Sequence, residues 1–504
     1  MTMADPFLGT LALVGAVVII SALLSGLIER SGVPQVGVLL ALGAVLGPYG
    51  LGLIDPRLDS PVLRAVSILS LALVLFTDAL SLDLAQIRRH RRLTQLVVGP
   101  GTLLSAVLVT LAARWLLDLP WPSAAILGAA LASTDPVLLR GLLRRPDLPT
   151  AARLALRLES GLNDVVLLPI VLVAMTFLGT RPMTEAAEWS RMGLELFLLG
   201  PAAGVAMGLL GVATLDLVRR RLGVRRDYES LYSLGVAFAA YAAAESVHGS
   251  GFLAAFAAGM TISTLDVELC DCFQEYGETT AELALLFTFV LLGSSLIWSG
   301  LAVADGRVLL FAIIALLVRP VAFLASLAPT RLDRKSLGLI AWFGPRGLSS
   351  LLLVLLPVFA GVPGSADLFA LCSLVVLLSV LLHGGSLMLL GRRVAASPGE
   401  PSEPAEPAAG TAPPPWKSAL PVVDHGEPGA AEPQLLPERI GIDDLKALWD
   451  TGEPVVVLDI RTLRSLEASN ATAEESVRLD PERPVQEAER LRLPKEAWLV
   501  AFCA

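Results

Sequence analysis

Long apolar blocks alternate with short loops along the first 391 residues of the chain. The blocks are continuous, unlike the alternating pattern of a barrel strand, and most approach the roughly 20 residues that an α-helix needs to cross a bilayer. The pattern predicts an all-α polytopic membrane protein with about 13 transmembrane helices. The predicted spans are residues 7–28, 33–54, 64–82, 93–117, 121–142, 151–178, 192–218, 229–247, 251–265, 280–300, 307–328, 335–358 and 366–391.

Basic residues in the loops predict the orientation of these spans. Twenty Lys and Arg residues fall on one predicted side, against six on the other. By the positive-inside rule, the N-terminus lies outside and the C-terminus lies in the cytoplasm of a plasma (inner) membrane. The acidic stretch 266–278 also falls on the cytoplasmic side, but acidic residues have little weight in the rule.

The composition changes abruptly after Arg393. Residues 1–395 form the predicted transmembrane domain, and residues 396–437, rich in Pro, Glu and Ala, have the composition of a flexible linker. Residues 438–504 contain two short apolar runs, 455–460 and 497–503, which predict a small α/β cytoplasmic domain.

Overall composition excludes several classes of protein. With 54% hydrophobic residues and a mean hydropathy of +0.69, the chain is too apolar for a soluble protein of its length. The basic residues sit in short loops, so nothing indicates a nucleic-acid partner. Four cysteines do not form a disulfide framework, and the pair Cys270 and Cys272 lacks the further ligands of a metal site.

The strongest candidate for chemistry is Asp164, inside the otherwise apolar span 151–178. It lies about 10 Å along a helix from Arg157, near the middle third of the hydrocarbon core. A carboxylate is costly at that depth and indicates an ion or proton site. Ser160, Asn163 and Asp164 share one helical face, with Glu159 beside it. Their oxygens suit a monovalent cation such as Na⁺, bound chiefly by Asp164 and Ser160; a polar clamp between helices is the alternative.

Two spans are predicted to be interrupted. In span 121–142, Pro136 removes a backbone donor after Thr134 and Asp135, and in span 335–358 Gly and Pro flank Arg346. Interrupted helices in both halves of a chain are typical of transporters built from inverted repeats. An ordinary proline kink capped by Thr134 is the alternative for the first break.

Two arginines, Arg319 and Arg346, lie in apolar spans and therefore need partners. The available carboxylates are Asp78, Asp135, Glu159 and Asp164. Asp78 either faces the same cavity as the others or marks the cytoplasmic end of its span.

Together, these residues resemble the sodium/proton exchanger family of cation:proton antiporters. The resemblance covers about residues 7–391 and rests on the motifs STDP (133–136), ESGLND (159–164), GSGFLAAFAAG (249–259), VRP (318–320) and GPRG (344–347). It implies a thirteen-helix fold, a core domain that moves against a dimerisation domain, and a homodimer. Thr77 is a departure, because many relatives have glutamate there.

The same resemblance implies roles for individual residues. Asp164 would carry the cation or the proton, with Asn163, Ser160 and Thr134 completing the site. Asp135 and Arg346 would balance two crossed half-helices, and Glu159 and Arg319 would form a structural ion pair.

The residue types also predict a stoichiometry. Because the span carries Asn163 and Asp164 rather than two carboxylates, only one of the pair can titrate, and Arg319 stays charged. We therefore expect electroneutral exchange of one cation, Na⁺ or alternatively K⁺, for one proton. These ions are cargo, and we expect neither a cofactor nor an enzymatic reaction.

The C-terminal region weakly resembles a rhodanese domain. Residues 455–461 resemble its first core strand, and Cys503 falls where its persulfide-carrying cysteine would follow a strand. The loop that would follow this cysteine is missing, so we expect a truncated or degenerate regulatory module. A packing cysteine is the alternative.

Three other functions are weaker interpretations. A cation channel would need a filter-like carbonyl loop, and a nucleotide-gated potassium-efflux system would need a GxGxxG fingerprint; the sequence shows neither. A membrane-anchored sulfurtransferase would not need thirteen spans with buried charges.

Overall fold

The protein was analysed as a computed structural model that divides into two units, Met1–Ser397 and Pro398–Ala504. Several predicted features lie outside the described residues. They are most of the first predicted span, most of the predicted linker, the acidic stretch 266–278 with Cys270 and Cys272, and Cys503. The structure describes residues 15, 19, 35–82, 84–143, 145, 148–178, 186–222, 226–265, 280–281, 284–330, 332–396, 445, 454–461, 476–479, 487–488, 490–491, 493–494 and 497–502.

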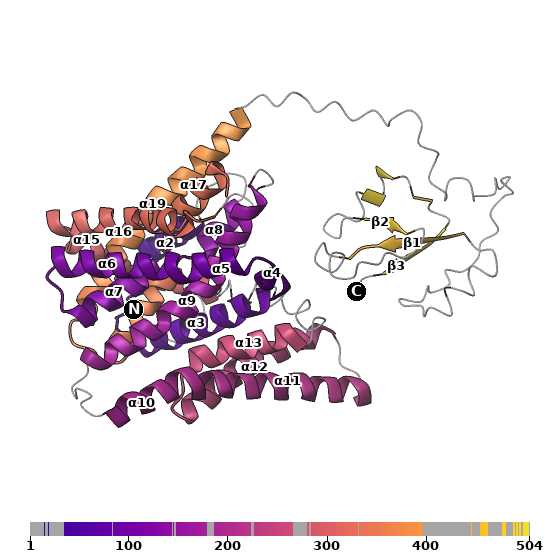
Figure 1. The fold of residues 1–504 in the computed structure, drawn as a ribbon, viewed down its shortest axis with the longest axis horizontal. Coiled ribbons are helices and arrows are strands. Elements are labelled where there is room, and N and C mark those ends of the chain that lie inside the picture. Colours follow the sequence, from indigo (N-terminus) through magenta and orange to yellow (C-terminus); the bar gives the residue numbers. More distant parts are fainter. Residues whose placement is uncertain are drawn as a thin grey trace, which may run out of the picture. The chain divides into compact units, whose positions relative to one another are not determined.

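The described part of the first unit is built from helices (Figure 1). They are α2 (Gln35–Leu46), α3 (Pro61–Ser81), α4 (Leu84–Arg89), α5 (Arg91–Leu96), η1 (Val97–Gly101), α6 (Thr102–Leu116), α7 (Trp121–Ala132), α8 (Pro136–Leu143), α9 (Thr150–Leu178), α10 (Ala186–Leu194), η2 (Glu195–Leu199), α11 (Gly200–Leu222), α12 (Arg226–Ser246), α13 (Gly251–Leu265), η3 (Leu296–Trp298), α15 (Ser299–Ala302), α16 (Gly306–Leu327), α17 (Arg334–Trp342), α18 (Leu348–Phe359) and α19 (Ser365–Ala396).

Among the described residues, seven helices are long and apolar enough to cross a membrane. There are eight if the pair Ala284–Ser294 and Leu296–Ala302, bent by 53°, is one span. Three further apolar helices, α2, α13 and α18, are shorter. The helical class of the protein therefore agrees with the sequence, whereas the count of thirteen spans stays a prediction.

The two breaks predicted beside Pro136 and Arg346 are both present. The chain leaves the helix after α7 at Ser133 and re-enters at Pro136, the first residue of α8. It leaves again after α17 and re-enters at Leu348, the start of α18. Pro136 fits the first position of α8 because that position has no helical partner for a backbone N–H.

Small residues let α3 and α11–α13 pack closely. A Cβ on Gly259 of α13 would lie 2.6 Å from the Phe76 carbonyl oxygen of α3, and one on Gly204 of α11 would collide with the Ala254 carbonyl of α13. The glycine-rich motif at 249–259 therefore acts in helix packing. Figure 1 shows α10–α13 grouped along one side of this unit.

The second unit contains a three-stranded parallel sheet with strand order β2-β1-β3. Its strands are β1 (Val455–Asp459), β2 (Val477–Arg478) and β3 (Trp498–Phe502), and they include parts of both predicted apolar runs. After β1, the Arg461 Nη2 atom lies 2.7 Å from Asp459 Oδ2, and its hydrogen bonds lower the pKa of the Asp459 carboxyl. The rhodanese-like assignment stays a prediction.

We expect Gly259→Ala to lower the free energy of unfolding by about 1–3 kcal/mol, because the added methyl group meets backbone that cannot yield. Gly235→Ala is the matched control, since Gly235 of α12 is exposed and has no atom within 4 Å of an added Cβ. Thermal unfolding of the purified proteins in detergent measures both. Equal melting temperatures would contradict the close packing of α3 and α13.

Candidate ion-binding site

Asp135 binds the N-terminal ends of two half-helices at once. Its Oδ1 accepts from the Val137 amide of α8 at 2.8 Å, and its Oδ2 accepts from the Leu348 amide of α18 at 2.6 Å. Its own amide donates to the Pro345 carbonyl at 2.9 Å. Helix N-termini carry partial positive charge and unpaired N–H groups, so the carboxylate compensates both ends.

Arginines compensate the opposite ends of the interrupted helices. Arg346 Nη1 donates to the carbonyls of Ala132 at 2.7 Å and Ser133 at 3.0 Å, where α7 ends. Arg319 Nη2 donates to the carbonyls of Ile340 and Phe343 at 3.1 Å, where α17 ends. All four half-helix ends at the crossing therefore face a charge of opposite sign.

Arg319 also forms a buried ion pair with Glu159 of α9. Its Nη1 contacts Oε1, and its Nη2 donates to Oε2 at 2.7 Å, a bidentate arrangement in which each residue is only 1% exposed. The Thr134 hydroxyl donates to the same carboxylate at 2.8 Å. The N-terminal end of α8 is therefore capped by Asp135, which accepts from the Val137 amide, and not by Thr134.

The glycines of the GPRG motif make room for these charged side chains. A Cβ on Gly344 would collide with the Arg319 side chain, and a Cβ on Gly347 would collide with the Asp135 carboxylate. The motif thus brings the second broken helix within hydrogen-bonding distance of the first.

Asp164 lies next to this crossing. The Ser133 hydroxyl donates to its Oδ1, and Ser349 of α18 also interacts with its carboxylate. Within the described part of the chain, no ion pair involves Asp164. Its buried Oδ2 has no hydrogen-bond donor there, nor has the buried Oδ1 of Asn163.

The remaining predicted site residues lie nearby but make other contacts. Asn163 Nδ2 points to the Thr134 carbonyl at 3.4 Å. The Ser160 hydroxyl donates to the Arg157 carbonyl at 3.3 Å, one turn back in α9. Half-buried Asp78 lies against α9, with its Cβ 3.9 Å from a Cβ built on Gly161.

Two hydroxyls at this site, Ser133 and Ser349, were not among the predicted site residues. Ser133 immediately precedes Thr134 at the first break, and Ser349 lies in the first turn of α18. Hydroxyl residues beside a helix break are the signal that could have identified them.

A cavity of about 500 Å³ adjoins the residue after Asp164. It is lined by Val165 of α9 and by residues of α11 and α13, among them Thr261 and Thr264. Both threonine hydroxyls donate to carbonyls of their own helix. The cavity therefore brings open space close to the Asp164 position.

A sequence model described as "Sodium/hydrogen exchanger, transmembrane" matches residues 17–393. The chain belongs to this family. The protein is accordingly a multi-pass integral membrane protein of a transporter family, in agreement with its apolar helices.

Curated relatives have names that indicate cation:proton exchange. The chain is 27% identical over 388 residues to "K(+)/H(+) antiporter NhaP" of Alkalimonas amylolytica, and 29% identical over 386 residues to "K(+)/H(+) antiporter NhaP2" of Shewanella baltica. These matches cover 75% and 74% of this chain. The chain spans 65% of the length of each relative.

A solved structure has a similar fold. The sodium proton antiporter MjNhaP1 from Methanocaldococcus jannaschii superposes with a TM-score of 0.62 at 20% sequence identity. The match covers 76% of this protein and 99% of that chain. The two proteins therefore share a fold.

We expect Glu159→Gln to lower the free energy of unfolding by about 3–5 kcal/mol, because it leaves Arg319 charged and buried without its counter-ion. The control is Glu195→Gln, which breaks the 2.7 Å pair with exposed Arg191 and costs about 0–1 kcal/mol. Thermal unfolding in detergent compares the two. A similar small loss for both variants would show that the buried pair does not stabilise the crossing.

Proposed function

We propose that this chain is a secondary active antiporter that exchanges one monovalent cation for one proton by alternating access, with Asp164 binding each in turn. The observation that carries the proposal is the isolation of this carboxylate. Asp164 is 2% exposed and has no ion-pair partner among the described residues. A buried carboxylate of this kind needs either a proton or a bound cation.

The surrounding charges support an electroneutral exchange. Glu159 is paired with Arg319, while Asp135 and Arg346 are each compensated by helix ends. Asp164 remains as the group whose charge changes during transport. Because one proton or one monovalent cation neutralises it, the same net charge crosses in both directions.

Oxygen atoms around Asp164 suit a hard monovalent cation. The orphaned Oδ2 of Asp164 and Oδ1 of Asn163 are acceptors that a cation would satisfy, and the Ser133 hydroxyl adds a third oxygen. The Ser160 hydroxyl donates its proton to the Arg157 carbonyl, which leaves the lone pairs of its oxygen as a further ligand for this set. Thr134 acts indirectly, by holding Glu159.

The cavity at Val165 supports access from one side of the membrane. The loop charges assign the Leu265 end of this cavity to the cytoplasm, with the N-terminus outside in a plasma membrane.

Asp78, on α3 beside Gly161, lies close enough to α9 to influence an ion near Asp164. The family resemblance further implies a homodimer. In this proposal the two ions are cargo, and no resident cofactor takes part.

The oxygen ligands suit both sodium and potassium. The relatives from Alkalimonas and Shewanella are named for K⁺, and the structure from Methanocaldococcus is named for sodium. The transport assay must therefore compare sodium, potassium and lithium.

We expect Asp164→Asn to abolish cation-driven proton movement in proteoliposomes, because the amide can neither release a proton nor neutralise a cation. The control is Asp367→Asn, which changes an exposed carboxylate in the first turn of α19 and should leave exchange unchanged. The rate of the native protein should not respond to an imposed membrane potential.

Equal exchange by the native protein and Asp164→Asn would refute the assigned role and direct attention to Asp78 and Asp135. A rate that follows the membrane potential in the native protein would refute the one-for-one stoichiometry while leaving antiport intact.

A further inference from the structure

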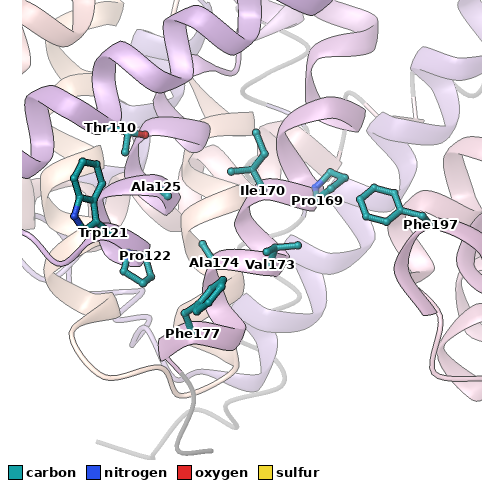
Figure 2. Close-up of a pocket in the computed structure, with 10 residues that line it drawn as sticks. All are labelled: Thr110, Trp121, Pro122, Ala125, Pro169, Ile170, Val173, Ala174, Phe177 and Phe197. Carbon is teal, nitrogen blue, oxygen red and sulfur yellow. The ribbon is translucent and has the colours of Figure 1, made fainter. Parts of the chain in front are cut away.

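A second cavity, of about 520 Å³, lies on the other side of Asp164 along α9. Figure 2 shows it between Trp121 and Pro122 of α7, the Pro169–Phe177 stretch of α9, and Phe197 of η2. Pro169 and Phe177 are eight residues apart, so the cavity extends about 12 Å along α9. It is therefore an elongated space at the surface of a membrane-spanning unit.

The lining of this cavity is apolar apart from the Thr110 hydroxyl and the Trp121 indole N–H. The Thr110 hydroxyl donates to the Ala106 carbonyl at 2.8 Å. Water needs two to four polar partners to be held in a cavity, which is more than the indole N–H alone can supply. Three aromatic rings at its edges, Trp121, Phe177 and Phe197, are each more than half exposed. The surface suits a hydrocarbon ligand.

A cationic group lies at the Trp121 end of the cavity. The guanidinium carbon of Arg114, in the last turn of α6, is 6.0 Å from the Trp121 ring centroid. Arg114 has a weak contact of 3.7 Å with Asp118, which is 79% exposed. Trp and Arg at the end of a span are typical of the level of lipid headgroups.

We propose that this cavity is a binding site for an anionic phospholipid. One acyl chain lies along α9 between Trp121 and Phe197, and the phosphate-bearing headgroup lies at Arg114. The elongated apolar lining accommodates the chain, and the adjacent guanidinium complements the headgroup charge. This site requires only that the unit spans a membrane and does not depend on the ion that Asp164 binds.

The test is photo-crosslinking of the full chain in phosphatidylcholine vesicles that contain phosphatidylglycerol with a diazirine in one acyl chain. Mass spectrometry then maps the adducts. We expect severalfold more adducts on residues 169–177 and on Phe197 than on α16, where Ile313, Leu317 and Val321 are exposed without lining this cavity. Unlabelled phosphatidylglycerol should compete better than unlabelled phosphatidylcholine.

Variants separate the two parts of the site. Ala174→Trp fills the cavity and should reduce the α9 adducts to the α16 level, whereas the matched change Leu317→Trp should leave them unchanged. Arg114→Gln should keep the adducts but remove the preference for phosphatidylglycerol. Unchanged α16 adducts show that each variant is still folded in the bilayer.

Three results would overturn the proposal. Equal labelling of α9 and α16 in the native chain would mean ordinary contact with bulk lipid. Absence of α9 adducts would mean that another part of the chain or a second copy covers the cavity. Adducts on α9 that persist in Ala174→Trp would mean that the acyl chain lies elsewhere. The competition between unlabelled phosphatidylglycerol and phosphatidylcholine tests the headgroup preference in the native chain.

Discussion

The arrangement of this protein depends on one carboxylate that accepts hydrogen bonds from two helices. Asp135 binds the Val137 amide of its own chain break and the Leu348 amide of a break more than 200 residues away. Inside a bilayer, unsatisfied backbone groups cost several kcal/mol each, so an interrupted helix is tolerated only where other groups satisfy its ends. Here the two interruptions satisfy each other: Asp135 serves the N-terminal ends, and Arg346 and Arg319 serve the C-terminal ends.

This compensation explains why Asp164 differs from the other buried carboxylates. Glu159 and Asp135 each have a fixed positive partner, either a guanidinium or a pair of helix N-termini. A group held in that way is poorly suited to gain and lose charge, because its partner would be left uncompensated. Asp164 has only hydroxyl neighbours among its described contacts, so a change in its charge leaves the crossing intact.

Sequence patterns predicted the elements of this arrangement better than their pairing. Pro136 and the Gly-Pro sequence before Arg346 coincide with both breaks, because proline and glycine weaken a helix. Pro169 and Pro320 nevertheless lie inside the helices α9 and α16, so the residue types alone do not decide where a helix breaks. The partner of each arginine cannot be predicted in the same way, because four carboxylates were available and only tertiary packing selects among them. The family resemblance named Glu159 for Arg319; from residue types alone, Asp78, Asp135 and Asp164 were equally acceptable.

The hydrogen bonds of the serine hydroxyls near Asp164 were also not predicted from the sequence. Helical spacing places Ser160 one turn before Asp164, yet its hydroxyl donates to the Arg157 carbonyl, a local alternative available to any serine in a helix. Conversely, Ser133 lies in the break after α7 and Ser349 lies in α18, and both interact with Asp164 of α9. The periodicity of a single helix does not predict such contacts. The side chains that surround the carboxylate are therefore fixed by the crossing.

The helix α9 runs without interruption from Thr150 to Leu178, with Pro169 inside it. It carries Glu159 at the crossing, Asp164 at the ion site, Val165 at one cavity and Pro169 at the other. Asp164 and Pro169 are only about 7 Å apart along the axis. Any displacement of α9 against η2, α11 and α13 therefore moves the carboxylate and one wall of each cavity together.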